Sequence, residues 1–314
     1  MSNPFISICI PTYKNVEYLQ RLLQSITIQT FKDFEVIITD DSPDDHAEQW
    51  LNKSQNLLVT YYKNQPAHGL PGNWNAAIQK AKGEWIKIMH DDDWFANESS
   101  LEQFANVAKN ARCDFIFSAC NNIHMPPGKE VHELLKGWRK EMLEEDILNL
   151  FYHNVIGHPS TVMHRKDETI LYDEQFKWVV DIDFYIRYMQ SHPGFVYIPE
   201  MLVNIGIDES QISNKYYKNP TVEIPEYFTM LNKYPVKITD NKYVFHAFWL
   251  LIRKFKIKNI EDIRTAGYSG DIPDKILSIV EYQKKIPRII LKQTPFSNYF
   301  MQKCFNKIHQ GLYK

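Results

Sequence analysis

Short apolar runs alternate with helical patterns along residues 1–125, and this alternation constrains the fold more than any other feature of the sequence. The apolar runs are rich in β-branched residues, which is typical of buried strands. They are FISICIP (5–11), FEVIITDD (34–41), LLVTYYKN (57–64), EWIKIM (84–89) and CDFIFSAC (113–120). Strands separated by helices require crossover connections, so the sequence predicts an α/β fold with a mainly parallel central sheet flanked by helices.

The chain is long enough for one large domain and an appendage. The pattern becomes helical and aromatic-rich from about Pro220. We therefore expect one domain over residues 1–218, large enough to carry a catalytic site, and a helical C-terminal region over residues 219–314. Four cysteines without CxxC spacing, and no basic and apolar leader, favour a reducing cytoplasmic environment. A net charge of −2 gives no reason to expect a nucleic acid partner.

Polar residues follow several of the predicted strands at the point where each strand ends. The first strand ends in Pro11-Thr12-Tyr13, the second in Asp40-Asp41-Ser42, and the fourth in Asp91-Asp92-Asp93. In an open α/β sheet, ligands bind in the crevice beyond the carboxyl ends of the strands. We therefore expect the two acidic clusters to meet at one site.

Carboxylates alone would repel a phosphate, but carboxylates that hold a divalent cation attract one. Mg²⁺ and Mn²⁺ prefer oxygen ligands and leave positions open for substrate phosphates. The sequence contains neither GxxxxGK[ST] nor GxGxxG, which argues against a P-loop or a dinucleotide-binding fold. The favoured ligand is therefore a nucleotide diphosphate held through Mn²⁺ or Mg²⁺.

Four segments of the sequence carry a family likeness. They are SICIPTYKNVEYLQRLLQSITIQTFKDFEVIITDDSPDD, NAAIQKAKGEWIKIMHDDDWF, WVVDIDFYIRYM and IPEMLVNIGIDESQIS. Together they resemble the opening, the DXD region, the acceptor-side motif and the closing segment of the inverting glycosyltransferases of family 2. The resemblance implies a GT-A (Rossmann-like) fold and the metal-dependent transfer of a sugar, commonly from a UDP-sugar, to a hydroxyl of a glycan or glycolipid. It also implies a role in surface polysaccharide biosynthesis.

The resemblance implies which residues bind the donor nucleotide. Pro11, Thr12 and Tyr13 would line the nucleobase pocket. Asp40 would accept a hydrogen bond from the base, and Asp41 would support it.

The resemblance also implies a metal site, with two departures from the family pattern. Asp92 would be the direct ligand, Asp93 would assist, and Asp91 would contact the ribose or the metal. His90 stands where the family often has the first carboxylate, which leaves open which acid contacts the ribose. Asp208 stands where the family usually has a histidine, and a carboxylate there could still ligate Mg²⁺ or Mn²⁺.

On the acceptor side, Asp181 matches the general base that takes the proton of the attacking hydroxyl. Asp183 is the second choice, although helical spacing turns it to another face. His158 is a candidate for facing the acceptor, and Trp178 is the best candidate for stacking on an acceptor sugar.

Two alternatives remain open at this stage. The chain could be an inactive nucleotide-sugar or glycan-binding module on the same fold, because of the exchange at Asp208. A metal-dependent nucleotidyltransferase ranks last, since PTYKNVEYL has no glycine-rich loop.

The basic segment 282–314 contains Lys and Arg mixed with apolar residues and no acid. It suits peripheral contact with an anionic membrane at the inner face of the cell membrane. It equally suits a helix packed on the protein with its lysines in solvent.

Overall fold

The computed structural model describes residues 3–54, 58–125, 128–209, 211 and 213–309. The chain forms two compact units, Met1–Lys140 with Ile156–Gln211, and Glu141–Val155 with Ile212–Lys314. The sequence-based boundary after residue 218 stays a prediction. The division differs from it chiefly in assigning the segment Glu141–Val155 to the helical unit.

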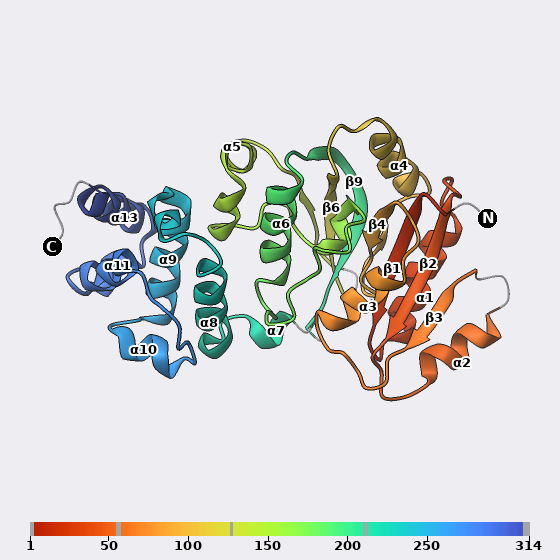
Figure 1. Ribbon diagram of the computed structural model, residues 1–314, viewed down its shortest axis with the longest axis horizontal. Coiled ribbons are helices and arrows are strands. Elements are labelled where there is room, and N and C mark those ends of the chain that lie inside the picture. The colour runs from red at the N-terminus through yellow and green to blue at the C-terminus, as the bar shows by residue number, and fades with distance from the viewer. Residues whose placement is uncertain (1–2, 55–57, 126–127, 210, 212, 310–314) are drawn as a thin grey trace. The chain divides into compact units, whose positions relative to one another are not determined.

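The first unit contains a sheet of nine strands among the described residues (Figure 1). The strands are β1 (Ile6–Thr12), β2 (Phe34–Asp40), β3 (Thr60–Lys63), β4 (Trp85–Ile88), β5 (Trp94–Phe95), β6 (Phe115–His124), β7 (Glu130–Glu133), β8 (Val162–Arg165) and β9 (Val196–Ile207). Their order is β3-β2-β1-β4-β8-β6-β9-β5, with β7 paired to β6. The five predicted strand segments correspond to β1, β2, β3, β4 and β6.

The sheet is mixed, whereas the sequence pattern predicts a mainly parallel one. Strands β3, β2, β1 and β4 are parallel neighbours, as expected from their crossover helices. Strand β8 then runs antiparallel between β4 and β6, and β5 runs antiparallel to β9. The parallel part carries the ends of β1, β2 and β4 to the same edge, which is the part of the fold that builds the site.

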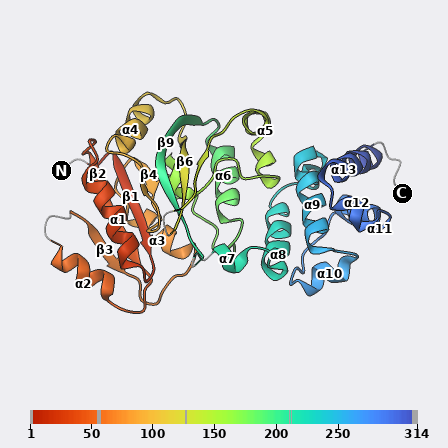
Figure 2. The ribbon, with the colours of Figure 1, turned by 180° about the vertical axis from the view of Figure 1, so that it is seen from behind.

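Helices cover both faces of this sheet (Figures 1 and 2). They are α1 (Val16–Thr27), α2 (His46–Lys53), α3 (Gly72–Lys80), α4 (Ser100–Asn110), the 3-10 turn η2 (Pro159–Thr161) and α6 (Val180–Ser191). Helix α1 begins at Asn15, whose side chain accepts a hydrogen bond from the Tyr18 backbone N–H. Helix α5 (Trp138–Glu145) spans the division between the units.

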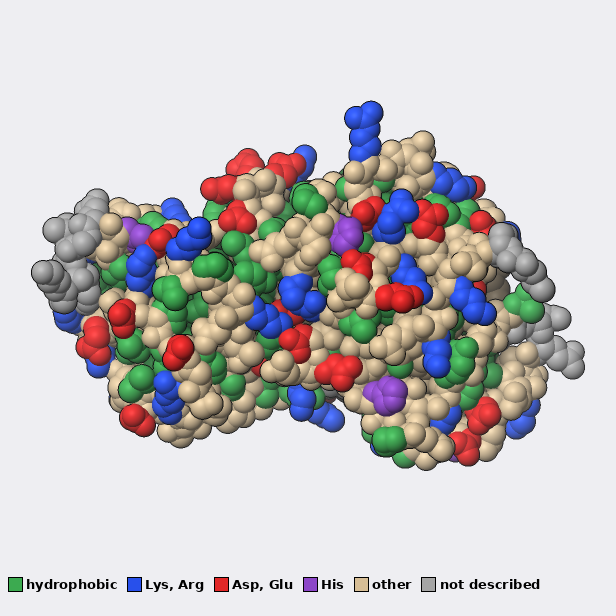
Figure 3. Space-filling model, in the orientation of Figure 1, with side chains coloured by type: hydrophobic (Ala, Val, Ile, Leu, Met, Phe, Trp, Pro, Cys, Tyr) green, Lys and Arg blue, Asp and Glu red, His purple; other side chains and the backbone are tan. Residues whose placement is uncertain are grey.

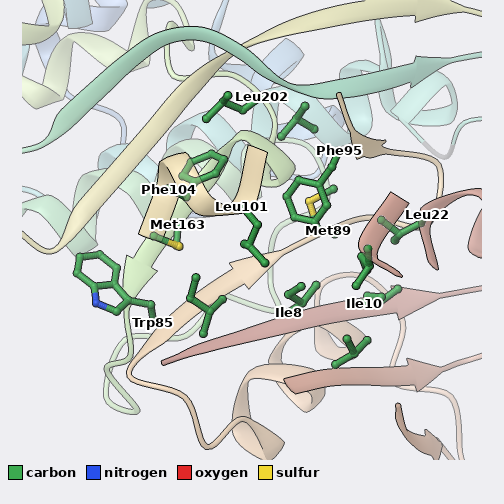
Figure 4. Close-up of a cluster of buried hydrophobic side chains, with 14 of the residues drawn as sticks. Ile8, Ile10, Leu22, Trp85, Met89, Phe95, Leu101, Phe104, Met163 and Leu202 are labelled. Atoms are coloured by element: carbon green, nitrogen blue, oxygen red, sulfur yellow. The ribbon is translucent and has the colours of Figure 1, made fainter. Parts of the chain in front are cut away.

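The core of this unit lies between the sheet and helices α1 and α4 (Figure 4). Alternate residues of β1, Ile8 and Ile10, turn toward Leu22 of α1, and Leu101 and Phe104 of α4 pack beside them. All seven residues of β1 are buried, as the continuous apolar run in the sequence predicts for a strand covered on both faces.

The second unit is helical throughout its described secondary structure. Its elements are η1 (Ile147–Phe151), α7 (Ser213–Tyr216), α8 (Pro220–Leu231), η3 (Val236–Asp240), α9 (Lys242–Phe255), α10 (Ile260–Thr265), α11 (Asp274–Lys284), α12 (Arg288–Leu291) and α13 (Thr294–His309). Asn241 caps α9 and donates to Asn149 Oδ1 at 2.8 Å, which binds η1 into this unit. None of the described helices has the length and apolar character needed to cross a bilayer.

Candidate active site at the carboxyl edge of the sheet

Strands β1 and β4 meet through a hydrogen-bonded pair at their carboxyl ends. The Thr12 hydroxyl donates to Asp91 Oδ2 at 2.6 Å, and the Tyr13 backbone N–H donates to the same oxygen at 3.2 Å. Thr12 is also the register partner of Asp40 on β2. The predicted convergence of the strand ends is therefore present, and it includes the first of the three adjacent aspartates.

His90, Asp92 and Asp93 form the candidate cation site. Their ligand atoms all lie within 4.8 Å of one another. Asp93 is almost fully buried and accepts a hydrogen bond from the Gly206 backbone N–H at 3.1 Å. Asp92 Oδ2 accepts a hydrogen bond from the Gln211 side-chain amide at 3.0 Å. Strand β9 and the segment after it thus hold two of the three members.

Burial is the main influence on the titration of Asp91, Asp93 and His90. Burial, together with the charge of Asp92, raises the pKa of Asp91 and of Asp93 above the ordinary carboxyl value. Burial lowers the pKa of His90, so its imidazole is neutral at physiological pH. A neutral imidazole and deprotonated carboxylates are the forms that bind a metal ion.

The residues present fit a divalent cation. His90 belongs to the same cluster as the two carboxylates, and its Nε2 is a buried nitrogen that has no hydrogen-bond partner in the described structure. A buried polar atom without a partner is costly unless a ligand satisfies it. Two carboxylates and one imidazole are a suitable donor set for Mn²⁺, and the carboxylates also suit Mg²⁺.

Asp40 and Asp41 are surrounded by protein donors. Asp40 is fully buried, and its oxygens accept from the Ser42 backbone N–H at 2.7 Å and the Tyr61 hydroxyl at 2.8 Å. Lys63 Nζ lies 3.2 Å from Asp40 Oδ2. Asp41 accepts from the backbone N–H groups of residues 68 and 69 at 3.1 and 2.7 Å. Asp41 therefore holds the loop after β3, whereas Asp40 contacts β3 itself and the residue that follows Asp41.

Asp208 is not a member of the three-residue cluster. It accepts a hydrogen bond from the Tyr18 hydroxyl on α1, and this bond raises the pKa of Tyr18. Pro11 is buried in β1, and Tyr13 is largely exposed beside Asp91.

Asp181 and Asp183 lie in the first turn of α6 and differ in their surroundings. Asp183 is fully buried and forms an ion pair with Arg187, with 2.7 Å between Oδ2 and Nε. Asp181 is half-buried, and its Oδ1 accepts a hydrogen bond from the Ile182 backbone N–H at 2.9 Å. The difference agrees with the helical spacing, which turns the two side chains to different faces.

The acceptor-side candidates include a histidine near the cation site. His158 precedes η2 and is half-buried, and burial lowers its pKa. Trp178 is half-buried just before α6. Trp74 also lies against the cluster, with its ring centroid 4.5 Å from that of His90.

Several residues that contact the acidic loop lie outside any motif, so the sequence alone does not identify them. Arg21 on α1 donates to the Asp92 carbonyl oxygen at 2.6 Å and stacks on the Trp94 ring at 3.8 Å. Gln211 and Ser160 also contact the cluster from distant parts of the chain. His90 lies inside a recognised motif, but sequence reasoning treats it as a lost carboxylate and not as a ligand.

Known proteins resemble this chain in sequence over most of its length. An uncharacterized glycosyltransferase of Methanocaldococcus jannaschii is 27% identical over 282 residues, which is 84% of this chain and 95% of that protein. The GalNAc(5)-diNAcBac-PP-undecaprenol beta-1,3-glucosyltransferase of Campylobacter jejuni is 32% identical over 108 residues, which is 33% of this chain and 35% of that protein.

Solved structures share the fold at low sequence identity. TarS of S. aureus in complex with UDP superposes with a TM-score of 0.59 and 20% identity, over 99% of this chain and 92% of that one. A mannosyltransferase of Pyrobaculum calidifontis in complex with GDP-Man and Mn²⁺ gives a TM-score of 0.58 and 12% identity, over 97% and 86%. The predicted GT-A-like fold with C-terminal helices is thereby confirmed.

The family assignment follows from the sequence match itself. Residues 7–170, which hold β1 to β4 and the cation site, match the family described as Glycosyl transferase family 2. The chain belongs to glycosyl transferase family 2.

Proposed function

We propose that this glycosyltransferase is a metal-dependent, inverting enzyme that moves a hexose from a nucleotide-diphosphate sugar to a hydroxyl of a glycan or lipid-linked glycan. The observation that carries the proposal is the cluster of His90, Asp92 and Asp93 beside the Thr12–Asp91 pair. UDP-sugars are the proposed donors; TarS structures with UDP and UDP-GlcNAc share the fold, as does a mannosyltransferase with GDP-Man.

The proposed cation is Mn²⁺ or Mg²⁺, held by His90, Asp92 and Asp93. When bound, such an ion offsets the charge that develops on a nucleoside diphosphate leaving group. Asp208 stays a candidate for a further ligand only through a change in its hydrogen bond to Tyr18. Thr12, Tyr13 and Asp91 are proposed to line the nucleotide site, with Pro11 beneath them.

Asp40 and Asp41 are proposed to act at the nucleobase end of this site. Because their oxygens already accept hydrogen bonds from protein groups, contact with a base requires the exchange of at least one of these bonds. Of the two, Asp41 contacts the loop after β3, through the backbone N–H groups of residues 68 and 69.

Asp181 is the proposed general base. The acceptor hydroxyl is a poor nucleophile, so a positioned carboxylate that takes its proton during attack lowers the barrier. The first turn of α6 supports this role, since Asp181 is half-buried there, whereas Asp183 is fully buried and ion-paired with Arg187. One base that acts opposite the leaving group gives inversion in a single displacement. Trp178, three residues before it in the chain, is proposed to stack on the acceptor sugar, and His158 to face the acceptor.

The decisive experiment separates chemistry from binding. A thermal-shift panel of nucleotide sugars, with and without Mn²⁺, identifies the donor, because a ligand that binds only the folded state raises the melting temperature. With that donor, Asp181→Asn should abolish transfer while leaving the donor-induced shift intact. An Asp181→Asn enzyme that remains active refutes the assignment of the base.

A second candidate function is an inactive nucleotide-sugar or glycan-binding module. The observation that favours it is Asp208, which stands where the family usually has a histidine. The two candidates differ in turnover. Mn²⁺-dependent hydrolysis or transfer of a UDP-sugar by the purified chain excludes the module, and donor binding without either reaction supports it.

We also propose that helices α12 and α13 contact an anionic membrane, at the cytoplasmic face, where a lipid-linked acceptor would be met. Ile289, Phe296 and Tyr299 are exposed by 73%, 54% and 53%. Exposed basic residues surround them, namely Lys284, Lys285, Arg288, Lys292, Lys303 and Lys307. Residues 282–309 contain no acid. Figure 3 shows basic, acidic and hydrophobic side chains mixed over the face of the helical unit that it presents. Charge and apolar area together suit anionic headgroups.

Point variants test the membrane proposal better than truncation does. Removal of α13 would take away Ser297, whose hydroxyl accepts a hydrogen bond from the buried Trp249 indole at 2.9 Å. The triple change of Ile289, Phe296 and Tyr299 to Ser should instead reduce sedimentation with phosphatidylserine vesicles. Val236→Ser removes an equally exposed side chain elsewhere in the same unit and serves as the control. Equal sedimentation of the wild type, the triple variant and Val236→Ser would contradict the proposal.

A further inference from the structure

Ser160 contacts both sides of the candidate cation site without belonging to it. It is fully buried in η2, and its hydroxyl oxygen accepts a hydrogen bond from the His90 backbone N–H at 2.9 Å. The same hydroxyl hydrogen-bonds the Asp93 carboxylate, for which it is the donor. A hydroxyl has one donor and can accept as well, so a single side chain satisfies both groups.

Lys87 connects Ser160 to strand β4 of the sheet. Lys87 is fully buried on β4, and its ammonium group donates to the Ser160 carbonyl oxygen. It also lies 5.0 Å from the centroid of the Phe104 ring. A buried lysine is costly unless its donors are used, so these contacts make η2 and β4 one connected piece beneath the cation site.

The same turn contacts the helix that carries the proposed base. The Tyr185 hydroxyl donates to the Gly157 carbonyl oxygen at 3.1 Å. Tyr185 is fully buried on α6, one helical turn after Asp181. Within the turn, the Thr161 hydroxyl donates to the His158 carbonyl oxygen at 2.8 Å. Residues 157–161 therefore connect His90 and Asp93 at one end with α6 at the other.

We infer that the turn 157–161 sets the position of the cation site relative to the base, with Ser160 and Tyr185 as positioning residues. The inference rests on the proposed function, since it assigns a role to the distance between the cation site and Asp181. A single displacement needs the base and the leaving group on opposite faces of one sugar at a fixed separation. Displacement of a reacting group by about 1 Å costs on the order of 100-fold in rate.

The first arm of the test measures cation binding alone. Ser160→Ala removes the hydroxyl that holds Asp93 and should raise the Mn²⁺ dissociation constant by about 10- to 100-fold, the usual effect of losing a group that orients a ligand. Titration of free Mn²⁺ by electron paramagnetic resonance measures it without substrate. Ser118→Ala is the matched control, because Ser118 is buried on β6 and its hydroxyl has no hydrogen-bond partner in the described structure.

The second arm measures the other end of the turn. Tyr185→Phe should leave the Mn²⁺ dissociation constant unchanged and lower kcat without changing KM for the donor. Tyr188→Phe is its control, because that buried tyrosine of the same helix donates to the Arg165 carbonyl oxygen at 2.7 Å and not to the turn. Melting temperatures show that each variant is folded at the assay temperature.

The outcomes separate this inference from the proposed function. Wild-type cation affinity in Ser160→Ala, or wild-type kcat in Tyr185→Phe, overturns the positioning role. Wild-type protein that binds no Mn²⁺ overturns the proposed cation site itself, and that result is obtained before any variant is compared. Loss of affinity in Ser160→Ala together with loss of kcat in Tyr185→Phe, with both controls unchanged, supports the inference.

Discussion

Gly206 on β9 lies so close to the acidic loop that a Cβ atom at this position would stand 2.4 Å from the Asp92 carbonyl oxygen. The Gly206 backbone N–H also donates to Asp93 Oδ1 at 3.1 Å. Only glycine allows both relationships, because any side chain would push the Asp92 backbone away from β9.

Gly206→Ala should therefore weaken cation binding by about 10- to 100-fold, as expected for a group that orients ligands. Calorimetric titration with Mn²⁺ measures this loss, and circular dichroism checks that the sheet is retained. A well-folded Gly206→Ala protein with wild-type affinity would show that the close approach to Asp92 has no role in the site.

His90→Asp should change the choice of metal. A nitrogen ligand suits Mn²⁺ better than Mg²⁺, whereas an all-carboxylate set suits both ions. We expect the ratio of the Mg²⁺ to the Mn²⁺ dissociation constant to fall in His90→Asp. His158→Gln, a nearby histidine outside the cluster, should keep the wild-type ratio. A ratio that stays the same in both variants argues against His90 as a ligand.

Asp183→Asn should affect stability, in contrast to the loss of chemistry expected for Asp181→Asn. Asp183 is fully buried and forms an ion pair with Arg187, whose side chain is 26% exposed. Loss of a charge-assisted hydrogen bond costs about 1.5–3 kcal/mol in the free energy of unfolding. Urea denaturation of the two variants measures the difference. Similar stabilities of Asp181→Asn and Asp183→Asn would contradict this division of roles.

Acid should destabilise the first unit through His164. Burial lowers the pKa of this imidazole to about 4, so the unfolded chain, with an ordinary pKa near 6.5, takes up the proton first. The stabilisation is complete above about pH 6.5 and is lost as the pH falls toward 4, by on the order of 3 kcal/mol. His164→Phe should flatten the dependence of unfolding free energy on pH in this window. Parallel curves for the two proteins would contradict the role of His164.

The parallel half of the fold is readable from the sequence because its strands are buried on both faces. Such strands appear as continuous apolar runs, as in β1 and β2. Strand β9 cannot be predicted in this way, because Pro199, Glu200 and Gly206 interrupt its apolar residues. Its pairing with β6 also contains register shifts. The mixed half of the sheet is therefore known only from the structure.

The site is readable to the extent that its residues share a motif. Asp91, Asp92 and Asp93 begin three residues after the end of β4 at Ile88, so their place at the sheet edge follows from the strand itself. The bond between Tyr18 and Asp208 spans 190 residues of sequence, and the contact of Ser160 with His90 spans 70. Nothing local in the sequence indicates such pairs, because they depend on how distant segments pack.

The helical unit is discontinuous in sequence, and this governs how the protein can be divided. Asn241 at the start of α9 hydrogen-bonds both Asp146 and Asn149, which come from the earlier segment Glu141–Val155. A fragment that begins near residue 219 would expose the apolar surface of α9 that η1 covers. Exchange of this unit between relatives would need two grafted segments, so recombination at a single crossover would not transfer the helical unit intact.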